Sequence, residues 1–304
     1  MFGIAIVCYL FLGGLGGAVS SIAAAIVLLA PKQALRDRRW KPFSALLLPL
    51  ACVAEGCLVA AGLCLLADSG RFEALGYLFF SQHPTILTVG AWLIVAQSVL
   101  CLFEVLVWFS PAGALARCVR TISALAVLTG FAVVLYSAFY LYGLQAVPLW
   151  HSAWLPPLFV ASSYSAGFAL AGAVSMVRGS DQLFRSLIGR FAVADLVMII
   201  LEAACAAGFF LAVSSASGRP GAAGEALAAF LAQLAQPPLS YAWWGGFVFL
   251  GIVVPLFLNV ASAFAGQRAT RKTVMLAICA AALAGSFALR LVIIVAGTHP
   301  VLGF

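Results

Sequence analysis

Long apolar runs separated by short polar segments dominate the pattern along this chain. A helix needs about 20 apolar residues to cross a hydrocarbon core about 30 Å thick, and each run reaches that length. The first run has no basic start and is as long as a full span, so we expect it to remain a helix and not to act as a cleaved signal. We predict an all-α integral membrane protein with eight transmembrane helices, near residues 4–30, 43–67, 85–109, 121–143, 156–177, 191–214, 241–265 and 273–297.

The composition agrees with a membrane environment. Of the 304 residues, 65% are hydrophobic and only 8% are charged, which is too few polar groups to cover a soluble domain of this size. The chain has 16 Lys and Arg against 9 Asp and Glu, so the position of the basic residues needs an explanation.

The basic residues gather in alternate loops. By the positive-inside rule these loops are cytoplasmic, and both termini then lie outside. The basic excess therefore indicates topology and contact with membrane lipid, and we predict no nucleic-acid partner. The loop residues are Lys32, Arg36, Arg38, Arg39, Lys41, Arg117, Arg120, Arg178, Arg185, Arg190, Arg268, Arg271 and Lys272.

Two of the predicted spans have similar sequences. The first contains LFLGGLGGAVSSIAAAIVLL and the fifth contains LFVASSYSAGFALAGAVSMV, which favours two four-helix bundles, residues 1–143 and 144–304. The glycines at 13, 14, 16 and 17 follow no strand, so they indicate close helix packing and not a nucleotide site. A short surface helix against the membrane or a partner is predicted for GEALAAFLAQLA.

The chain offers few ligands for a prosthetic group. None of its eight cysteines has Cys-x2-Cys spacing, and none of its three histidines lies in the middle of a predicted span. We therefore predict no metal, no haem and no iron–sulfur cluster in this chain.

Five ionisable residues fall inside predicted spans. Each costs several kcal/mol there unless it meets water, a partner charge or a proton. Either they fix helix packing through buried ion pairs and hydrogen bonds, or they form a proton path. They are Glu55, Glu104, Asp195, Glu202 and Arg290.

A second polar group lies at the predicted outer boundary, where the segment ADSGRFEAL interrupts the apolar pattern. Asp68 and Arg71 could simply cap a helix end. Alternatively Asp68 and His83 exchange protons beside an aromatic slot formed by Trp92 and the tyrosines of VLYSAFYLY, a combination that suits a quinone.

Several motifs, in order along nearly the whole chain, resemble those of the NrfD/polysulfide reductase (PsrC) membrane-subunit family. The segments that carry the resemblance are YLFLGGLGG, GLCLLADSGRFEAL with TVGAW, LTGFAVVLYSA with PLWHSAWLPPLFVASS, WWGGFVFLGIVVPLFLN and GSFALRLVIIVAG.

The resemblance implies a quinone-interacting anchor in a bacterial cytoplasmic membrane, bound to a four-cluster, ferredoxin-like iron–sulfur subunit and to a molybdopterin or cytochrome catalytic subunit on the outer face. Menaquinone or menaquinol would be its bound substrate, as in anaerobic respiration, with no catalysis of the terminal reaction by this chain alone. The expected catalytic residues are Asp68 and His83, and the expected quinone contacts are Tyr9, Trp92, Tyr136, Tyr140 and His151.

A secondary transporter or proton-conducting protein is the alternative. It is motivated by the five intramembrane charges and the two similar halves. Such a protein would have a central water-lined substrate site and no dependence on quinone.

Overall fold

The computed structural model describes residues 4–30, 40–69, 86–109, 114–144, 146–178, 182–265 and 272–298. Within these ranges the regular elements are helices and there is no strand. The helices are α1 (Ile4–Leu29), α3 (Trp40–Ser69), α5 (Ile86–Phe109), α6 (Ala114–Tyr142), α7 (Leu155–Arg178), α8 (Gln182–Ser217), α9 (Ala222–Leu234), the π-helical segment η1 (Tyr241–Val253), α10 (Val254–Ala265) and α11 (Lys272–Thr298).

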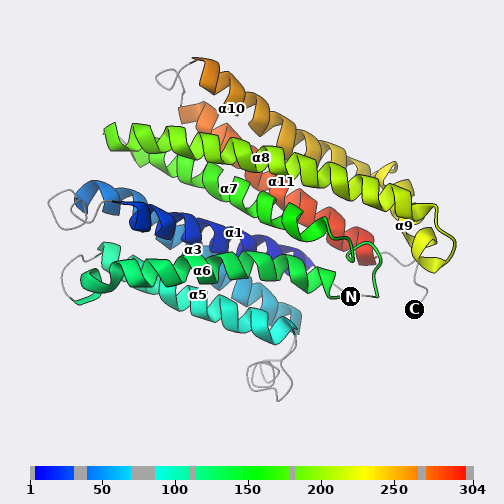
Figure 1. Cartoon of the computed structure of the whole chain (residues 1–304), viewed down its shortest axis with the longest axis horizontal. Helices are drawn as coiled ribbons and strands as arrows, with labels where there is room; N and C mark the ends of the chain where they lie inside the picture. The colour runs from blue at the N-terminus through cyan, green and yellow to red at the C-terminus, as the bar shows by residue number, and fades with distance from the viewer. Residues whose placement is uncertain are drawn as a thin grey trace.

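Eight helices are long and apolar enough to cross a membrane, with η1 and α10 together forming the seventh. This confirms the predicted all-α membrane fold. The start of α1 and the end of α11 lie at one end of the molecule, here called the Tyr9 end, and the start of α8 lies at the other, here called the Arg190 end (Figure 1). That the Tyr9 end faces outward stays a prediction from the basic loops, because residues 31–39 lie outside the described residues.

The central helices differ from the peripheral ones. Most of α1, α7 and α11 is buried, whereas only about a third or less of α3, α5, α8 and the η1–α10 helix is buried. In a bilayer the exposed apolar side chains of those outer helices meet lipid. Polar side chains are therefore best sheltered beside α1, α7 and α11.

The first helix α1 packs against α3 and α6 and also against α7, so it lies between the two halves of the chain (Figure 1). The α7 helix in turn packs against α8 and α11, and α11 packs against η1. The division at residue 143 into two four-helix bundles stays a prediction. Such a division would produce helix contacts within each half like those described here.

The glycines of α1 permit this central position. A Cβ on Gly17 would lie 2.8 Å from the Gly130 carbonyl oxygen, and a Cβ on Gly130 would lie 2.7 Å from the Gly17 carbonyl oxygen. Any side chain at either position would push α1 and α6 apart. The observed contact is the close helix packing that the sequence indicated.

The short helix α9 occupies the predicted segment. Its residues Leu227, Phe230 and Leu234 are buried, and the Phe230 ring centroid lies 6.5 Å from that of Phe209 on α8. The apolar face of α9 therefore packs on its own chain and is not free for a partner.

Candidate functional site

Three tyrosines from two helices meet near the Tyr9 end. The Tyr9 hydroxyl donates a hydrogen bond to the Tyr136 hydroxyl over 3.2 Å, and both side chains are buried. The ring centroids of Tyr136 and Tyr140, one helical turn apart on α6, are separated by 6.1 Å. Because Tyr9 donates, the Tyr136 proton is left for an acceptor outside this pair.

The Tyr136 ring fits only because residue 90 is glycine. A Cβ on Gly90 would lie 1.8 Å from the Cζ atom of Tyr136, so any side chain there would collide with the ring. The small residue of the TVGAW segment on α5 therefore makes room for a tyrosine of α6.

Asp68 completes this group, which we call the tyrosine cluster (Tyr9, Tyr136, Tyr140 and Asp68). Asp68 lies exposed near the end of α3, close enough to Tyr140 for the two groups to interact electrostatically. The cluster thus combines a solvent-accessible carboxylate with buried phenols. Such a combination can hold an oxygen by hydrogen bonds and pass its proton to water.

The other expected contacts behave differently. Trp92 lies two residues after Gly90, and so about 200° around α5 from it, and is 45% exposed. It points away from the tyrosine cluster. The exposed ring of His151 stacks on Tyr142 with centroids 4.7 Å apart, and its Nδ1 lies 3.3 Å from the Tyr142 carbonyl oxygen. His83 lies outside the described residues.

Two acids of the first half are incompletely bonded. Ser98 donates a hydrogen bond to Oε1 of Glu55 over 2.6 Å, and Ser123 donates one to Oε1 of Glu104 over 3.1 Å. In each acid the second oxygen, Oε2, is buried and has no hydrogen-bond partner among the described residues. Such an oxygen is the natural position for a proton, because an unpaired charge there is costly.

Cys101 connects the two acids. It follows Ser98 by three residues and precedes Glu104 by three, so all three residues share one face of α5. Cys101 interacts electrostatically with both Glu55 and Glu104, and its Sγ donates to the Ala51 carbonyl oxygen over 3.3 Å. The two carboxyls therefore belong to one polar stripe along α5.

Gln97 extends this stripe toward the centre, and sequence reasoning missed it. Its Nε2 donates to the Ser20 hydroxyl on α1 over 2.6 Å, and its Oε1 accepts a short hydrogen bond from Thr129 on α6. Gln97 is completely buried. An amide within a predicted span was a signal of the same kind as the carboxylates, since both must find partners there.

The acid Asp195 of the second half is fully bonded. Ser165 on α7 donates to its Oδ1 over 2.9 Å, and Asn259 on α10 donates to its Oδ2 over 2.8 Å. Asp195 therefore joins three helices. The amide of Asn259 was, like Gln97, an intramembrane polar group that the sequence analysis did not use.

Arg290 is the most buried charge, with no exposed surface. Its Nη1 donates to the backbone oxygen and the hydroxyl of Ser286, both over 2.7 Å, and its Nη2 donates to the Ser163 hydroxyl over 2.6 Å. Its Nε reaches the Leu10 carbonyl oxygen at 3.3 Å. The guanidinium thus links α11, α7 and α1.

Two more features accommodate this guanidinium. A Cβ on Gly14 would lie 3.2 Å from Nη2 of Arg290, so the glycine leaves space for it. Glu202 on α8 interacts electrostatically with Arg290 and lies near Ser162. The interaction of Arg290 with this carboxyl is therefore supplemented by serines and backbone carbonyls.

The fold and these groups define a multi-pass membrane protein with a phenol–carboxylate cluster and buried acids between its helices. A family model described as "Polysulphide reductase, NrfD" matches residues 1–301, and the chain belongs to this family. No curated protein matches the chain. Family membership makes it a membrane subunit of the quinone-linked oxidoreductase complexes, which associates with catalytic and iron–sulfur subunits.

Proposed function

We propose that this chain exchanges electrons between the menaquinone pool and a four-cluster, ferredoxin-like iron–sulfur subunit, with the quinone bound at the tyrosine cluster. The observation that carries the proposal is the buried Tyr9–Tyr136 hydroxyl pair, next to which Tyr140 interacts with exposed Asp68. A bound quinone supplies the two-electron redox chemistry. The chain supplies hydrogen bonds, orientation and proton exchange.

Each residue of the cluster has a distinct task. The Tyr136 hydroxyl, which accepts from Tyr9, donates to a quinone oxygen. The Asp68 carboxylate takes up the proton released from that oxygen and passes it to water, because it lies exposed at the helix end. His83 serves the same proton exchange, and His151 closes the aromatic side of the site.

Electrons leave toward the iron–sulfur subunit, which binds at the Tyr9 end. The terminal substrate then reacts on a molybdopterin or cytochrome subunit held on the same outer face. We place the complex in a bacterial cytoplasmic membrane. The partner subunits are placed on the outer face because, in the proposed orientation, the loops at the Arg190 end are cytoplasmic.

The buried ionisable residues have two different roles, proton transfer and helix packing. Glu55 and Glu104, whose Oε2 atoms lack partners among the described residues, carry protons along α5. Asp195 and Arg290 hold the helices of the second half together, because their polar atoms are bonded to serines, an amide and a backbone carbonyl. Glu202 supplies the counter-charge of Arg290.

The experiment has two stages. Gentle detergent extraction should recover this chain together with an iron–sulfur protein, a catalytic subunit and menaquinone. In that complex, Asp68→Asn should lower quinol turnover about 100-fold, the scale of lost acid–base catalysis. Tyr136→Phe should lower it about tenfold through loss of one hydrogen bond to the quinone.

The matched control is Tyr241→Phe, a tyrosine that is 73% exposed on η1 near the same end of the molecule. It should leave turnover unchanged. Unchanged kinetics in both Asp68→Asn and Tyr136→Phe, with the complex intact, would remove the quinone from this site. Recovery of the chain alone, without quinone and stabilised by a small solute, would favour the transporter alternative.

A further inference from the structure

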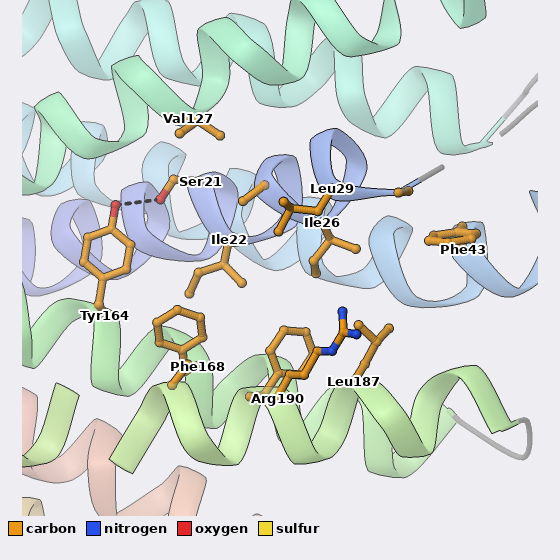
Figure 2. Close-up of a pocket in the computed structure, with 14 residues that line it drawn as sticks. Ser21, Ile22, Ile26, Leu29, Phe43, Val127, Tyr164, Phe168, Leu187 and Arg190 are labelled. Carbon is orange, nitrogen blue, oxygen red and sulfur yellow. Dashed lines mark hydrogen bonds between the residues drawn. The ribbon is translucent and has the colours of Figure 1, made fainter. Parts of the chain in front are cut away.

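A cavity, here called the seam pocket, lies between the two halves of the chain and away from the tyrosine cluster. Its volume is about 420 Å³, within the range of about 300–1,000 Å³ typical of small-molecule sites. Figure 2 shows it between α1 and the helices α7 and α8. It is lined by Ser21, Ile22, Ala25, Ile26, Leu29, Ala30, Phe43, Val127, Tyr164, Phe168, Leu187, Arg190, Phe191 and Ala194.

The hydroxyl groups at the inner end of the seam pocket already form hydrogen bonds within the chain. Ser21 Oγ lies 2.8 Å from the Gly17 carbonyl oxygen and 3.0 Å from that of Ala18, and can donate to either of them. The Tyr164 hydroxyl lies 3.0 Å from Ser21 Oγ, and either hydroxyl can be the donor of this hydrogen bond (Figure 2). Both hydroxyls already have a hydrogen-bond partner within the chain, so the inner end suits a hydrocarbon better than a carbonyl group.

The outer end of the seam pocket is cationic. Arg190 is exposed and is the one charged residue among the described side chains that line the cavity. Arg120 donates to the carbonyl oxygens of Leu28 and Ala30, over 2.6 and 3.0 Å, and Ala30 lines the same cavity. The cavity therefore runs from an apolar interior to a positively charged rim.

This rim lies where the helices end. Leu29 is the last residue of α1, and Phe43 lies in the first turn of α3. Arg190 belongs to the third turn of the long helix α8, on the same side of the molecule (Figure 2). An exposed arginine at the end of transmembrane helices lies at the level of lipid headgroups.

We infer that the seam pocket binds an anionic phospholipid of the leaflet at the Arg190 end, with its phosphate on Arg190 and one acyl chain in the cavity. Arginine suits phosphate because its planar fork donates two parallel hydrogen bonds. Basic pockets between transmembrane helices are known to take anionic headgroups. The apolar walls, formed by Ile22, Ile26, Phe168 and Phe191 among others, accept the chain.

Native mass spectrometry of the full-length protein, with any subunits that accompany it, tests this inference. The detergent-solubilised protein is titrated with phosphatidylglycerol or phosphatidylcholine of the same acyl chains. Wild type should retain phosphatidylglycerol roughly tenfold better, the value of one charge-assisted hydrogen-bonding contact. Arg190→Gln should remove this preference, and Ala25→Phe, which fills the cavity, should weaken retention of both lipids.

Arg219→Gln is the matched control, because Arg219 is exposed just after the end of α8, at the opposite end of that helix from Arg190. It should retain the wild-type preference. The inference is overturned if Arg190→Gln prefers phosphatidylglycerol as strongly as wild type does. It is also overturned if the molecule displaced by Ala25→Phe is a quinone, which would make the seam pocket a second quinone site.

Discussion

The acids of the two halves of the chain differ in how completely their oxygens are bonded. In the second half, Asp195 accepts hydrogen bonds on both oxygens, from Ser165 and Asn259. In the first half, Glu55 and Glu104 each have one oxygen that is buried and unpartnered among the described residues. Buried carboxyl groups in the same apolar protein thus differ in how many of their oxygens accept a hydrogen bond.

The difference separates a structural role from a chemical one. A fully bonded buried group holds its helices in place, and moving a proton onto it would break existing contacts. A half-bonded carboxyl has one oxygen available for a proton without loss of its serine contact. The comparison therefore assigns packing to the second half and proton exchange to the first, and four substitutions can break or sharpen it.

The largest effect is expected at Arg290. Replacement by Met removes the donor to Ser163, Ser286 and Leu10 and leaves Glu202 buried without its counter-charge, at a cost of about 3–5 kcal/mol in the free energy of unfolding. Unfolding by SDS titration in mixed micelles measures it. Arg219→Met, at an exposed position, should unfold like wild type. A stable Arg290→Met protein would show that the second half does not depend on this network.

Asp195→Leu should be the next most damaging. It leaves the Asn259 amide and the Ser165 hydroxyl buried without an acceptor, which costs about 1–3 kcal/mol. Asp195→Asn is the control, because its amide can accept from Asn259 and donate to Ser165. The same SDS titration compares them. If Asp195→Leu and Asp195→Asn lower the free energy of unfolding equally, the charge at residue 195, and not its hydrogen bonds, stabilises the protein.

Glu104→Gln should change the free energy of unfolding little but slow proton transfer. The Gln side chain can still accept from Ser123, so the free energy of unfolding should change by less than about 1 kcal/mol. Proton transfer coupled to quinol turnover should nevertheless fall by roughly tenfold or more, because an amide cannot carry the proton. Proton release by vesicles containing the complex measures this. Glu225→Gln, exposed on α9, should match wild type, and normal proton release in Glu104→Gln would exclude Glu104 from the path.

The smallest effect is expected for Glu55→Gln. Glu55 is only half-buried, whereas Glu104 is almost fully buried, so its carboxyl is less confined by protein groups and its loss should matter less to proton transfer. The loss of proton release should be smaller than at Glu104, and the double variant should lose no more than Glu104→Gln alone if both acids serve one path. Additive losses would instead indicate two independent routes.

Much of the fold could be predicted from the sequence because a membrane span is a local property. The eight apolar runs became eight helices, since twenty successive apolar residues have no better way to satisfy their backbone in lipid. The glycines of α1 were also correctly interpreted as contact points, although which helix each one would meet was not predictable. Gly17 meets α6, and Gly14 meets Arg290 of α11.

The candidate site was predicted less completely. Tyr136 and Tyr140 were expected to lie near Asp68. The structure places Tyr140 close enough to Asp68 to interact with it, and Tyr136 lies next to Tyr140 and bonds to Tyr9. Trp92 was expected in the same slot, but the helical turn between Gly90 and Trp92 directs it to the other face of α5. Gln97 and Asn259 were overlooked because attention to charge alone misses uncharged amides, although Asn259 bonds to Asp195 and Gln97 joins Ser20 to Thr129.

The sequence by itself determined the membrane class, the number of spans and the positions of the buried ionisable groups, because each follows from the residues of one short segment. The tertiary structure decided which acids are fully bonded, which aromatic rings face one another, and where a cavity remains between α1, α7 and α8. Those properties depend on partners more than a hundred residues apart in several cases, such as Leu10 with Arg290. Only helix packing brings such partners within hydrogen-bonding distance.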